Sequence, residues 1–156
     1  MDKKAKSARA AARLAAVQAL YQMEAAGAGV EAVIREFDAY RLGGEIDGYA
    51  LIEADTEFFA EILRGAVELQ TRIDPYIERH LASGWTLKRL DATARAILRA
   101  ALFELSVRPD IPFRVVIDEY LEVANAFFEG DEPAFINGIL DAAAQDVRAD
   151  EIAGVG

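Results

Sequence analysis

The sequence contains no cysteine and only one histidine, His80. Without cysteine, the chain can form neither a disulfide framework nor a thiolate metal site, and it has no thiol nucleophile. We interpret His80, which stands beside Arg79 at the end of a predicted helix, as a solvated residue that complements the helix dipole. The sequence therefore predicts no catalytic residue, and it excludes a hydrolytic triad and a zinc site.

The sequence also lacks a Walker phosphate loop and a GxGxxG fingerprint. The pair Gly43-Gly44 is explained more simply as a loop between two helices. The paired acids Asp118 and Glu119 point about 100° apart on a helix, so they do not converge on a metal ion. These absences predict a protein that is not an enzyme and that needs no metal and no cofactor.

Long apolar runs are missing as well. No run approaches the roughly 20 residues that a helix needs to cross a bilayer. The first residues, MDKKAKSARAAARLAAVQALYQ, contain no cleavage site after a compact apolar core. Since a chain without cysteine suits a reducing compartment, we expect a cytoplasmic protein that does not associate with membranes.

What the sequence does contain is enough apolar material for one folded domain. The 156 residues are 53% hydrophobic and 28% charged, which is typical of a globular chain and not of a disordered one. We find no internal repeat and no linker. We therefore expect residues 1–156 to form a single domain, with a basic N-terminal arm at residues 1–13 and a frayed tail at residues 149–156.

The charge is distributed unevenly. The formal net charge is −10, yet the first thirteen residues carry +4 and the remaining 143 carry −14. We call residues 1–13 the basic arm. Such segregation predicts that the arm binds a polyanion, while the body would repel RNA. The cations of the arm are Lys3, Lys4, Lys6, Arg9 and Arg13.

The apolar residues recur at steps of three and four, and strict alternation is absent, so the pattern predicts an all-α fold. Glycines, prolines and candidate capping residues divide the chain into about seven helices. Asp74, Asp91 and Asp131 are the expected N-caps, with Pro75 as the first residue of the fourth helix. The expected helices span about 4–26, 30–40, 55–73, 75–83, 91–105, 115–128 and 131–148, with a break at RPDIP before the sixth.

Two arginines and several aromatic residues receive specific predictions. Arg95 and Arg99 are expected on the face of their helix opposite to the buried one. Most aromatic residues at amphipathic spacing are expected in the core or at its edge. For Tyr21 and Phe135 burial is also the expected state. Stacking on an unpaired base stays open as the alternative, because Tyr21 follows the basic arm and Phe135 begins the last helix. The residues expected in or beside the core are Phe58, Phe59, Trp85, Phe103 and Phe127.

Three blocks of the sequence form a recognisable combination. They read ARLAAVQALYQ near the start, RLDATARAILRAALFEL in the middle and DIPFRVVIDEYLEVANAFFEGDEPAFINGILD near the end. In order, spacing and content these blocks resemble the signature of the NusB family of transcription antitermination proteins. The resemblance covers nearly the whole chain, and the pairing of DIPFRVVIDEY with FINGILD is specific. It implies two small helical bundles packed across each other, in agreement with the helix count.

The resemblance also implies a function. Proteins of this family bind the single-stranded boxA element of nascent RNA together with the ribosomal protein NusE. The pair then loads onto the RNA polymerase elongation complex and supports processive transcription of ribosomal RNA. By this resemblance, the basic first helix contacts phosphate and two further blocks face the RNA. The residues implied are Lys3, Lys4, Lys6, Arg9, Arg13, Tyr21, Asp131 and Phe135.

Two alternatives of other classes stay open. The first is a helical adaptor that forms a homodimer without RNA, with the basic arm as a solubilising tail. The second is the RNA-binding module of a ribosomal RNA cytosine methyltransferase, whose cofactor-binding part would need some 200 further residues. A salt-dependent RNA titration separates the adaptor from the RNA-binding factor, and chain length separates the methyltransferase module from it.

Overall fold

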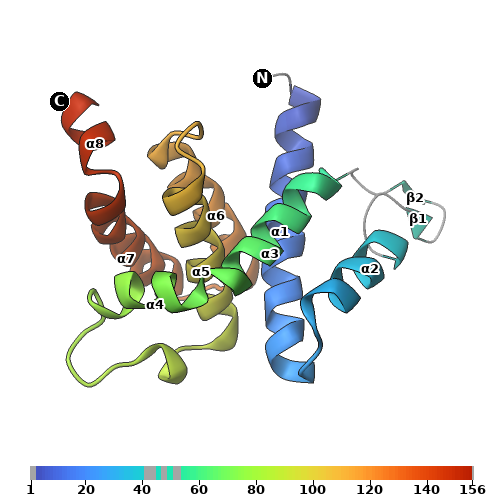
Figure 1. Cartoon of the computed structure of the whole chain (residues 1–156), viewed down its shortest axis with the longest axis horizontal. Coiled ribbons are helices and arrows are strands. Elements are labelled where there is room, and N and C mark those ends of the chain that lie inside the picture. The colour runs from blue at the N-terminus through green and yellow to red at the C-terminus, as the bar shows by residue number, and fades with distance from the viewer. Residues whose placement is uncertain (1–2, 41–44, 47–48, 51–53, 156) are drawn as a thin grey trace.

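The computed structural model describes residues 3–40, 45–46, 49–50 and 54–155, with side chains for residues 6–38 and 54–153. In these parts the chain is almost entirely helical (Figure 1). Two short strands, β1 (Glu45–Ile46) and β2 (Tyr49–Ala50), pair in antiparallel fashion. The predicted loop at Gly43-Gly44 lies outside the described residues. The helices are α1 (Lys3–Ala26), α2 (Val30–Tyr40), α3 (Thr56–Glu68), α4 (Gln70–Glu78), α5 (Ala92–Val107), α6 (Phe113–Phe127), α7 (Glu132–Val147) and α8 (Ala149–Val155), with a 3-10 helix at Leu87–Arg89.

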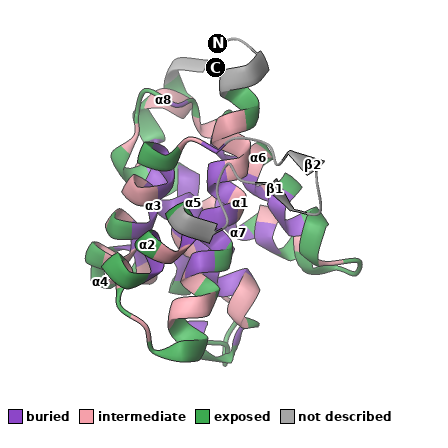
Figure 2. Cartoon of the chain, turned by 90° about the vertical axis from the view of Figure 1, so that its right-hand side faces the viewer, coloured by how far each residue is buried: buried purple, intermediate pink, exposed green. Residues whose placement is uncertain are grey.

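The helices form two groups that share one core. Helices α1, α2 and α3 pack against one another, and α5 packs with α6 and α7. Helix α5 also contacts α1, α3 and α4, so it joins the two groups. Figure 2 shows the buried residues gathered where the helices face one another. The predicted all-α fold of two small bundles is confirmed.

The close approach of α3 and α5 depends on one glycine. A Cβ atom at Gly65 would lie 2.0 Å from Cε1 of Phe103, which is too close for two carbon atoms that are not bonded. Gly65 therefore lets the two bundles meet, and Phe103 fills the space that a larger residue would occupy. The large side chains that fill the core around this contact include Phe37, Phe59, Ile62, Leu63, Ile97, Leu98 and Leu102.

The predicted N-caps have different outcomes. The carboxylate of Asp91 accepts a hydrogen bond from the backbone N–H group of Thr93, at 2.8 Å, which confirms this cap. Asp55 caps α3 in the same way, with a bond of 3.0 Å from the N–H group of Phe58, although the sequence pattern does not predict this cap. Asp131 stands at the N-cap position of α7, but its side chain makes no capping hydrogen bond. The prediction that Asp74 is an N-cap is wrong, because Asp74 lies inside α4.

The fourth helix starts earlier than the sequence suggests. Helix α4 begins at Gln70, directly after the bend at Leu69, and contains Pro75 in its interior. The carboxylate of Asp74 instead accepts two hydrogen bonds from Arg99, both at 3.0 Å. Proline at this position removes one helical hydrogen bond, which is why the sequence predicts a boundary at Pro75, but the helix continues through it to Glu78.

The position of Arg95 differs from the prediction. Arg95 is 7% exposed, because its guanidinium donates to main-chain carbonyls of the loop before α5, so its expected exposed position is wrong.

Residues 149–155 form helix α8. The chain is fixed just before it by Arg148, which donates to the carbonyl oxygens of Leu105 and Arg108 at 2.7 and 2.8 Å. Fraying of residues 149–156 stays a prediction. None of the described helices is both long and apolar enough to cross a membrane.

Candidate nucleic-acid interface

Helices α1 and α6 run side by side, and two grooves open along their junction. The first groove lies at the start of both helices and has a volume of about 260 Å³. We call it the arm groove. Its lining combines apolar residues with cations from α1 and carboxylates from α6 and the turn before it. It is lined by Lys6, Arg9, Arg13, Asp110, Ile111, Pro112, Val115 and Glu119.

Lys6 and Arg9 present free positive charge at this groove. Lys6 is exposed, and Arg9 is half-buried with its guanidinium 5.2 Å from the centroid of the Phe58 ring. Within the described residues neither cation has a hydrogen bond or an ion pair. Both are therefore available to an anionic ligand. For Lys3 and Lys4 the structure places the backbone in α1, while their side chains lie outside the described residues.

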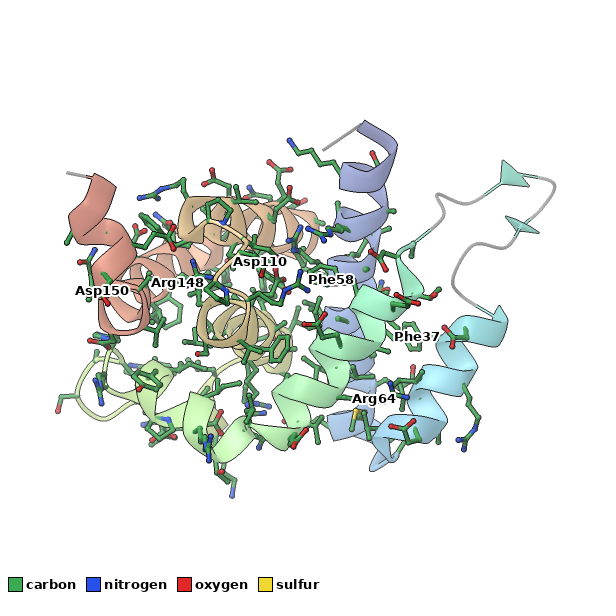
Figure 3. The ribbon with its side chains drawn as sticks, turned by 45° about the horizontal axis from the view of Figure 1, so that its top comes forward. Phe37, Phe58, Arg64, Asp110, Arg148 and Asp150 are labelled. Atoms are coloured by element: carbon green, nitrogen blue, oxygen red, sulfur yellow. The ribbon has the colours of Figure 1, made fainter. Side chains whose placement is uncertain are left out.

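Asp110 lies across from Arg9 and is held by another arginine. It accepts two hydrogen bonds from Arg108, at 2.9 and 2.8 Å. These bonds, together with the nearby charge of Arg9, lower the pKa of Asp110 to about 2. Figure 3 labels Asp110 and Phe58, which lie where α1, α3 and the turn before α6 meet. The carboxylate is thus occupied by Arg108, and Arg9 keeps its own donors free.

Arg13 has a different environment from the other cations of the arm. It is 3% exposed, and it donates two hydrogen bonds to the carboxylate of Glu104, at 2.9 and 3.0 Å. Burial alone would lower the pKa of Arg13, but its hydrogen bond to Glu104 and the charge of that carboxylate raise it overall. The prediction that Arg13 belongs to an exposed phosphate-binding surface is wrong, because its charge is neutralised inside the core.

Two further groups complete this buried cluster. Tyr120 donates its hydroxyl hydrogen to Glu104, and burial raises the pKa of the Tyr120 hydroxyl well above its ordinary value. Glu119 lies 3.8 Å from Arg13 at the edge of the arm groove. The carboxylate of Glu104, which is fully buried, is therefore surrounded by donors from α1 and α6. We call Arg13, Glu104 and Tyr120 the buried triad.

The second groove lies farther along α1 and has a volume of about 530 Å³. We call it the aromatic groove. Two rings stand in it: Tyr21 is 47% exposed and Phe127 is 41% exposed. The expected burial of Tyr21 is therefore wrong, and its ring is open to stacking. The prediction that Phe127 lies in or beside the core is wrong. The groove is lined by Val17, Gln18, Tyr21, Gln22, Ala25, Ala26, Asp91, Thr93 and Phe127.

The remaining predicted contacts also lie at the surface. Phe135 is 42% exposed in the first turn of α7, and Asp131 is exposed just before it. The expected burial of Phe135 is thus wrong as well. The end of α6 and the start of α7, joined by a short connection, each carry one exposed phenyl ring. Trp85, expected at the core edge, is 50% exposed. Sequence reasoning missed Phe127 and Trp85 as surface residues.

A third hollow, of about 550 Å³, lies on α1, α3, α4 and α5. Four charged residues of its lining neutralise one another: Arg99 pairs with Asp74 and lies 4.0 Å from Glu24, which also pairs with Arg95. This network fixes the helices together and leaves little net charge for a ligand. Within the described residues no group of three or more histidine, aspartate or glutamate side chains could hold a metal ion.

Fold and surface together define a small helical protein in which unpaired cations and exposed rings lie along α1 and α6, with further exposed rings at Phe135 and Trp85. Such an arrangement is typical of binding to single-stranded nucleic acid. Comparison with known proteins gives the family. Residues 10–145 match the family model of the NusB family, and the chain belongs to this family of transcription antitermination proteins. The resemblance seen in the three sequence blocks is confirmed.

Individual relatives agree with this assignment. The chain is 59% identical to the transcription antitermination protein NusB of Caulobacter vibrioides over 140 residues, which are 90% of this chain and 94% of the relative. It superposes on NusB from T. maritima with a TM-score of 0.73 and 33% identity, covering 88% of this chain and 91% of the other. A chain in a crystal structure of the antitermination factors NusB and NusE with double-stranded RNA has a TM-score of 0.68 at 23% identity, over 88% of this chain and 96% of that one, and shares the fold.

Proposed function

We propose that this protein is a non-catalytic antitermination factor that binds boxA-type single-stranded RNA together with the ribosomal protein NusE. The complex would act on the RNA polymerase elongation complex during ribosomal RNA synthesis, in the bacterial cytoplasm. The observation that carries the proposal is the surface along α1 and α6, where unpaired cations stand at one end and exposed rings at the other. Such a surface suits a strand whose phosphates and unpaired bases both need partners.

The proposed RNA contacts follow from exposure. Lys6 and Arg9 meet phosphate, and Tyr21 and Phe135 stack on bases, with Asp131 at the start of α7 beside them. Lys3 and Lys4 extend the cationic end. Phe127 joins the set because it shares the aromatic groove with Tyr21. Arg13 leaves the set because its charge is buried against Glu104.

The negative charge of the residues outside the basic arm favours a basic partner protein. Outside the basic arm the chain carries −14, which repels phosphate. A basic ribosomal protein docked on this acidic body would neutralise the repulsion and add cationic contacts of its own. We therefore propose positive coupling between RNA and NusE. Couplings of this kind usually correspond to about 5- to 150-fold in affinity, and linkage requires the effect to be reciprocal.

The salt dependence of RNA binding tests the role of the arm. The variant with Lys6→Ala and Arg9→Ala should bind a boxA-type RNA more weakly, and the slope of log K against log salt should flatten by roughly 0.7 for each phosphate that the variant no longer neutralises. A matched control removes two exposed arginines of α2 and α4, Arg35→Ala and Arg72→Ala, which have no ion pair within the described residues. The control should keep the wild-type slope.

The same titration has outcomes that decide against the proposal. An unchanged slope in the Lys6 and Arg9 variant would show that these side chains do not touch phosphate. Should NusE leave RNA affinity unchanged, or compete with RNA for this chain, the ternary assembly would be wrong. A protein that forms dimers but binds no RNA would instead favour the adaptor.

A further inference from the structure

The loop between α4 and α5 carries an exposed tryptophan. Trp85 is 50% exposed, and the guanidinium of Arg89 lies 5.1 Å from the centroid of its ring. Arg89 also donates a hydrogen bond to the carbonyl oxygen of Gly84, at 2.6 Å. Gly84 adopts a φ of +89°, which a residue with a side chain rarely adopts. The turn at Gly84 thus places Arg89 against the indole ring.

The loop carries unpaired positive charge in a chain that is acidic overall. Lys88 and Arg89 are both exposed, and within the described residues neither forms an ion pair with a carboxylate. Most other arginines of the described part do, including Arg13, Arg64, Arg99 and Arg108. Two neighbouring cations beside an exposed indole therefore form a distinct feature, which we call the tryptophan loop (residues 84–89).

The loop is held firmly against the end of α1. Arg95 donates to the carbonyl oxygens of Leu87 and Leu90, at 2.9 and 2.7 Å, and pairs with Glu24 of α1. These bonds tie the main chain of the loop to α5 and, through Glu24, to α1. The position of the tryptophan loop is thus fixed relative to the last turns of α1.

The loop adjoins the proposed RNA surface through the start of α5, while Lys88 itself lines the third hollow. Asp91 and Thr93, which follow it in the chain, line the aromatic groove together with Tyr21 and Phe127. In Figure 1 the first turns of α1 and the connection between α4 and α5 lie at opposite ends of the molecule. From Lys6 to Glu24 helix α1 rises about 27 Å, which corresponds to roughly eight phosphates at the spacing of a stacked strand.

We propose that the tryptophan loop is a second contact for single-stranded RNA, where Trp85 stacks on a base and Lys88 and Arg89 meet phosphate. The inference rests on the proposed function, because the strand must first bind the basic arm. The continuity of the loop with the aromatic groove favours RNA over an acidic protein as the occupant. An exposed ring with an arginine at its face is also the arrangement on which bases stack in single-strand binding proteins.

The experiment uses the fact that Trp85 is the only tryptophan of the chain, so its fluorescence reports on this loop alone. Two RNAs of roughly 6 and roughly 16 nucleotides bracket the eight-phosphate span. We expect the longer RNA to quench the fluorescence of Trp85, whereas the shorter one binds the arm and leaves the fluorescence unchanged. Binding itself is measured by the anisotropy of labelled RNA.

Variants of the tryptophan loop test the same inference through their affinities for the two RNAs. Trp85→Ala should weaken binding of the longer RNA by about 5- to 150-fold, the range for loss of one stacked base, and should leave binding of the shorter RNA unchanged. Trp85→Phe should retain most of the affinity for the longer RNA. Replacement of Lys88 and Arg89 by serine should flatten the salt slope for the longer RNA only. The control pair Arg35→Ser and Arg72→Ser should behave as wild type.

The outcomes separate this inference from the proposed function. If both RNAs bind through Lys6 and Arg9, but Trp85 is not quenched and Trp85→Ala binds the longer RNA normally, the inference fails and the proposed function stands. If neither RNA binds the wild-type protein, both fail. Loss of binding to an acidic protein in Trp85→Ala, with RNA affinity unchanged, would assign the loop to a protein partner and overturn the inference.

Discussion

Arg9 and Arg13 stand one turn apart on the same helix and lie at nearly the same distance from the same ring. Their guanidinium groups are 5.2 and 5.1 Å from the centroid of Phe58. Yet Arg9 is half-buried and has no ion pair within the described residues, whereas Arg13 is buried and bonded to Glu104. The same residue type at neighbouring positions thus serves the surface in one case and the core in the other.

The cause of the difference lies outside the basic arm. Glu104 is 91 positions away from Arg13 in the sequence, and it comes into contact only because α5 crosses α1. Tyr120 of α6 completes the cluster from a third helix. A buried carboxylate needs a cation, because an isolated charge in the core is very costly. Arg13 therefore joins the arm to the core, and Arg9 remains available to a ligand.

The largest effect is expected when Arg13 alone is removed. Arg13→Ala leaves Glu104 as a buried charge without its partner, so the free energy of unfolding should fall by about 3 to 5 kcal/mol. Arg9→Ala should remove only the interaction with the Phe58 ring, about 0.5 to 1 kcal/mol. Urea denaturation of both variants measures the difference.

Equal losses of stability in Arg13→Ala and Arg9→Ala would contradict the comparison, since they would mean that Glu104 does not depend on Arg13. The m-value should stay the same in both variants. A changed m-value would point to an altered unfolded state instead of a broken ion pair.

A smaller effect is expected when both charges of the pair are removed together. The variant with Arg13→Met and Glu104→Met has no buried charge, but it leaves the hydroxyl of Tyr120 without its acceptor, which costs about 1 to 3 kcal/mol. The further change Tyr120→Phe should recover most of that loss. Thermal melts of the double and triple variants test this order. If the double variant were less stable than Arg13→Ala, the buried triad would stabilise the fold by more than the mutual neutralisation of Arg13 and Glu104.

The next effect concerns RNA and not stability. Arg9→Ala should flatten the slope of log K against log salt by roughly 0.7, the change expected for a single phosphate on a single strand. Arg9→Lys keeps the charge and should keep the slope. The variant with Arg13→Met and Glu104→Met should also keep it, because Arg13 does not reach the solvent. A flattened slope in that variant would remove the functional distinction between the two arginines.

Much of the fold was predictable because it depends on local pattern. The apolar periodicity and the cap at Asp91 specify helices through contacts within a few residues. The bounds of α2, Val30–Tyr40, agree with the prediction at both ends. By contrast, the boundary at Pro75 failed because tertiary packing kept the helix intact through a proline.

The site was less predictable because exposure depends on partners distant in sequence. Phe127 follows Val123 and Ala124 at helical spacing, so its periodicity predicts burial, and only the end of α6 places it in solvent. Trp85 lies in a loop without periodicity. No local signal distinguishes Arg13 from Arg9, because the distinction depends on Glu104.

The smallest effect is a pKa change at Asp110, which lies beside Arg9 and not beside Arg13. Hydrogen bonds from Arg108 lower the pKa of Asp110 from about 3.8 to about 2, and the charge of Arg9 contributes to the same shift. A carboxylate with a lowered pKa binds fewer protons in the folded state than in the unfolded state. It therefore adds stability above pH 3.8 that is lost as the pH falls toward 2.

Asp110→Asn should consequently flatten the loss of stability between pH 4 and pH 2. Arg9→Ala should raise the pKa of Asp110, as followed by the carboxyl ¹³C shift, because it removes a nearby positive charge. The variant with Arg13→Met and Glu104→Met should leave that pKa where it is, since Arg13 is not among the groups that shift it. A raised pKa in the second variant, and none in the first, would mean that the charge facing the arm groove comes from Arg13 after all.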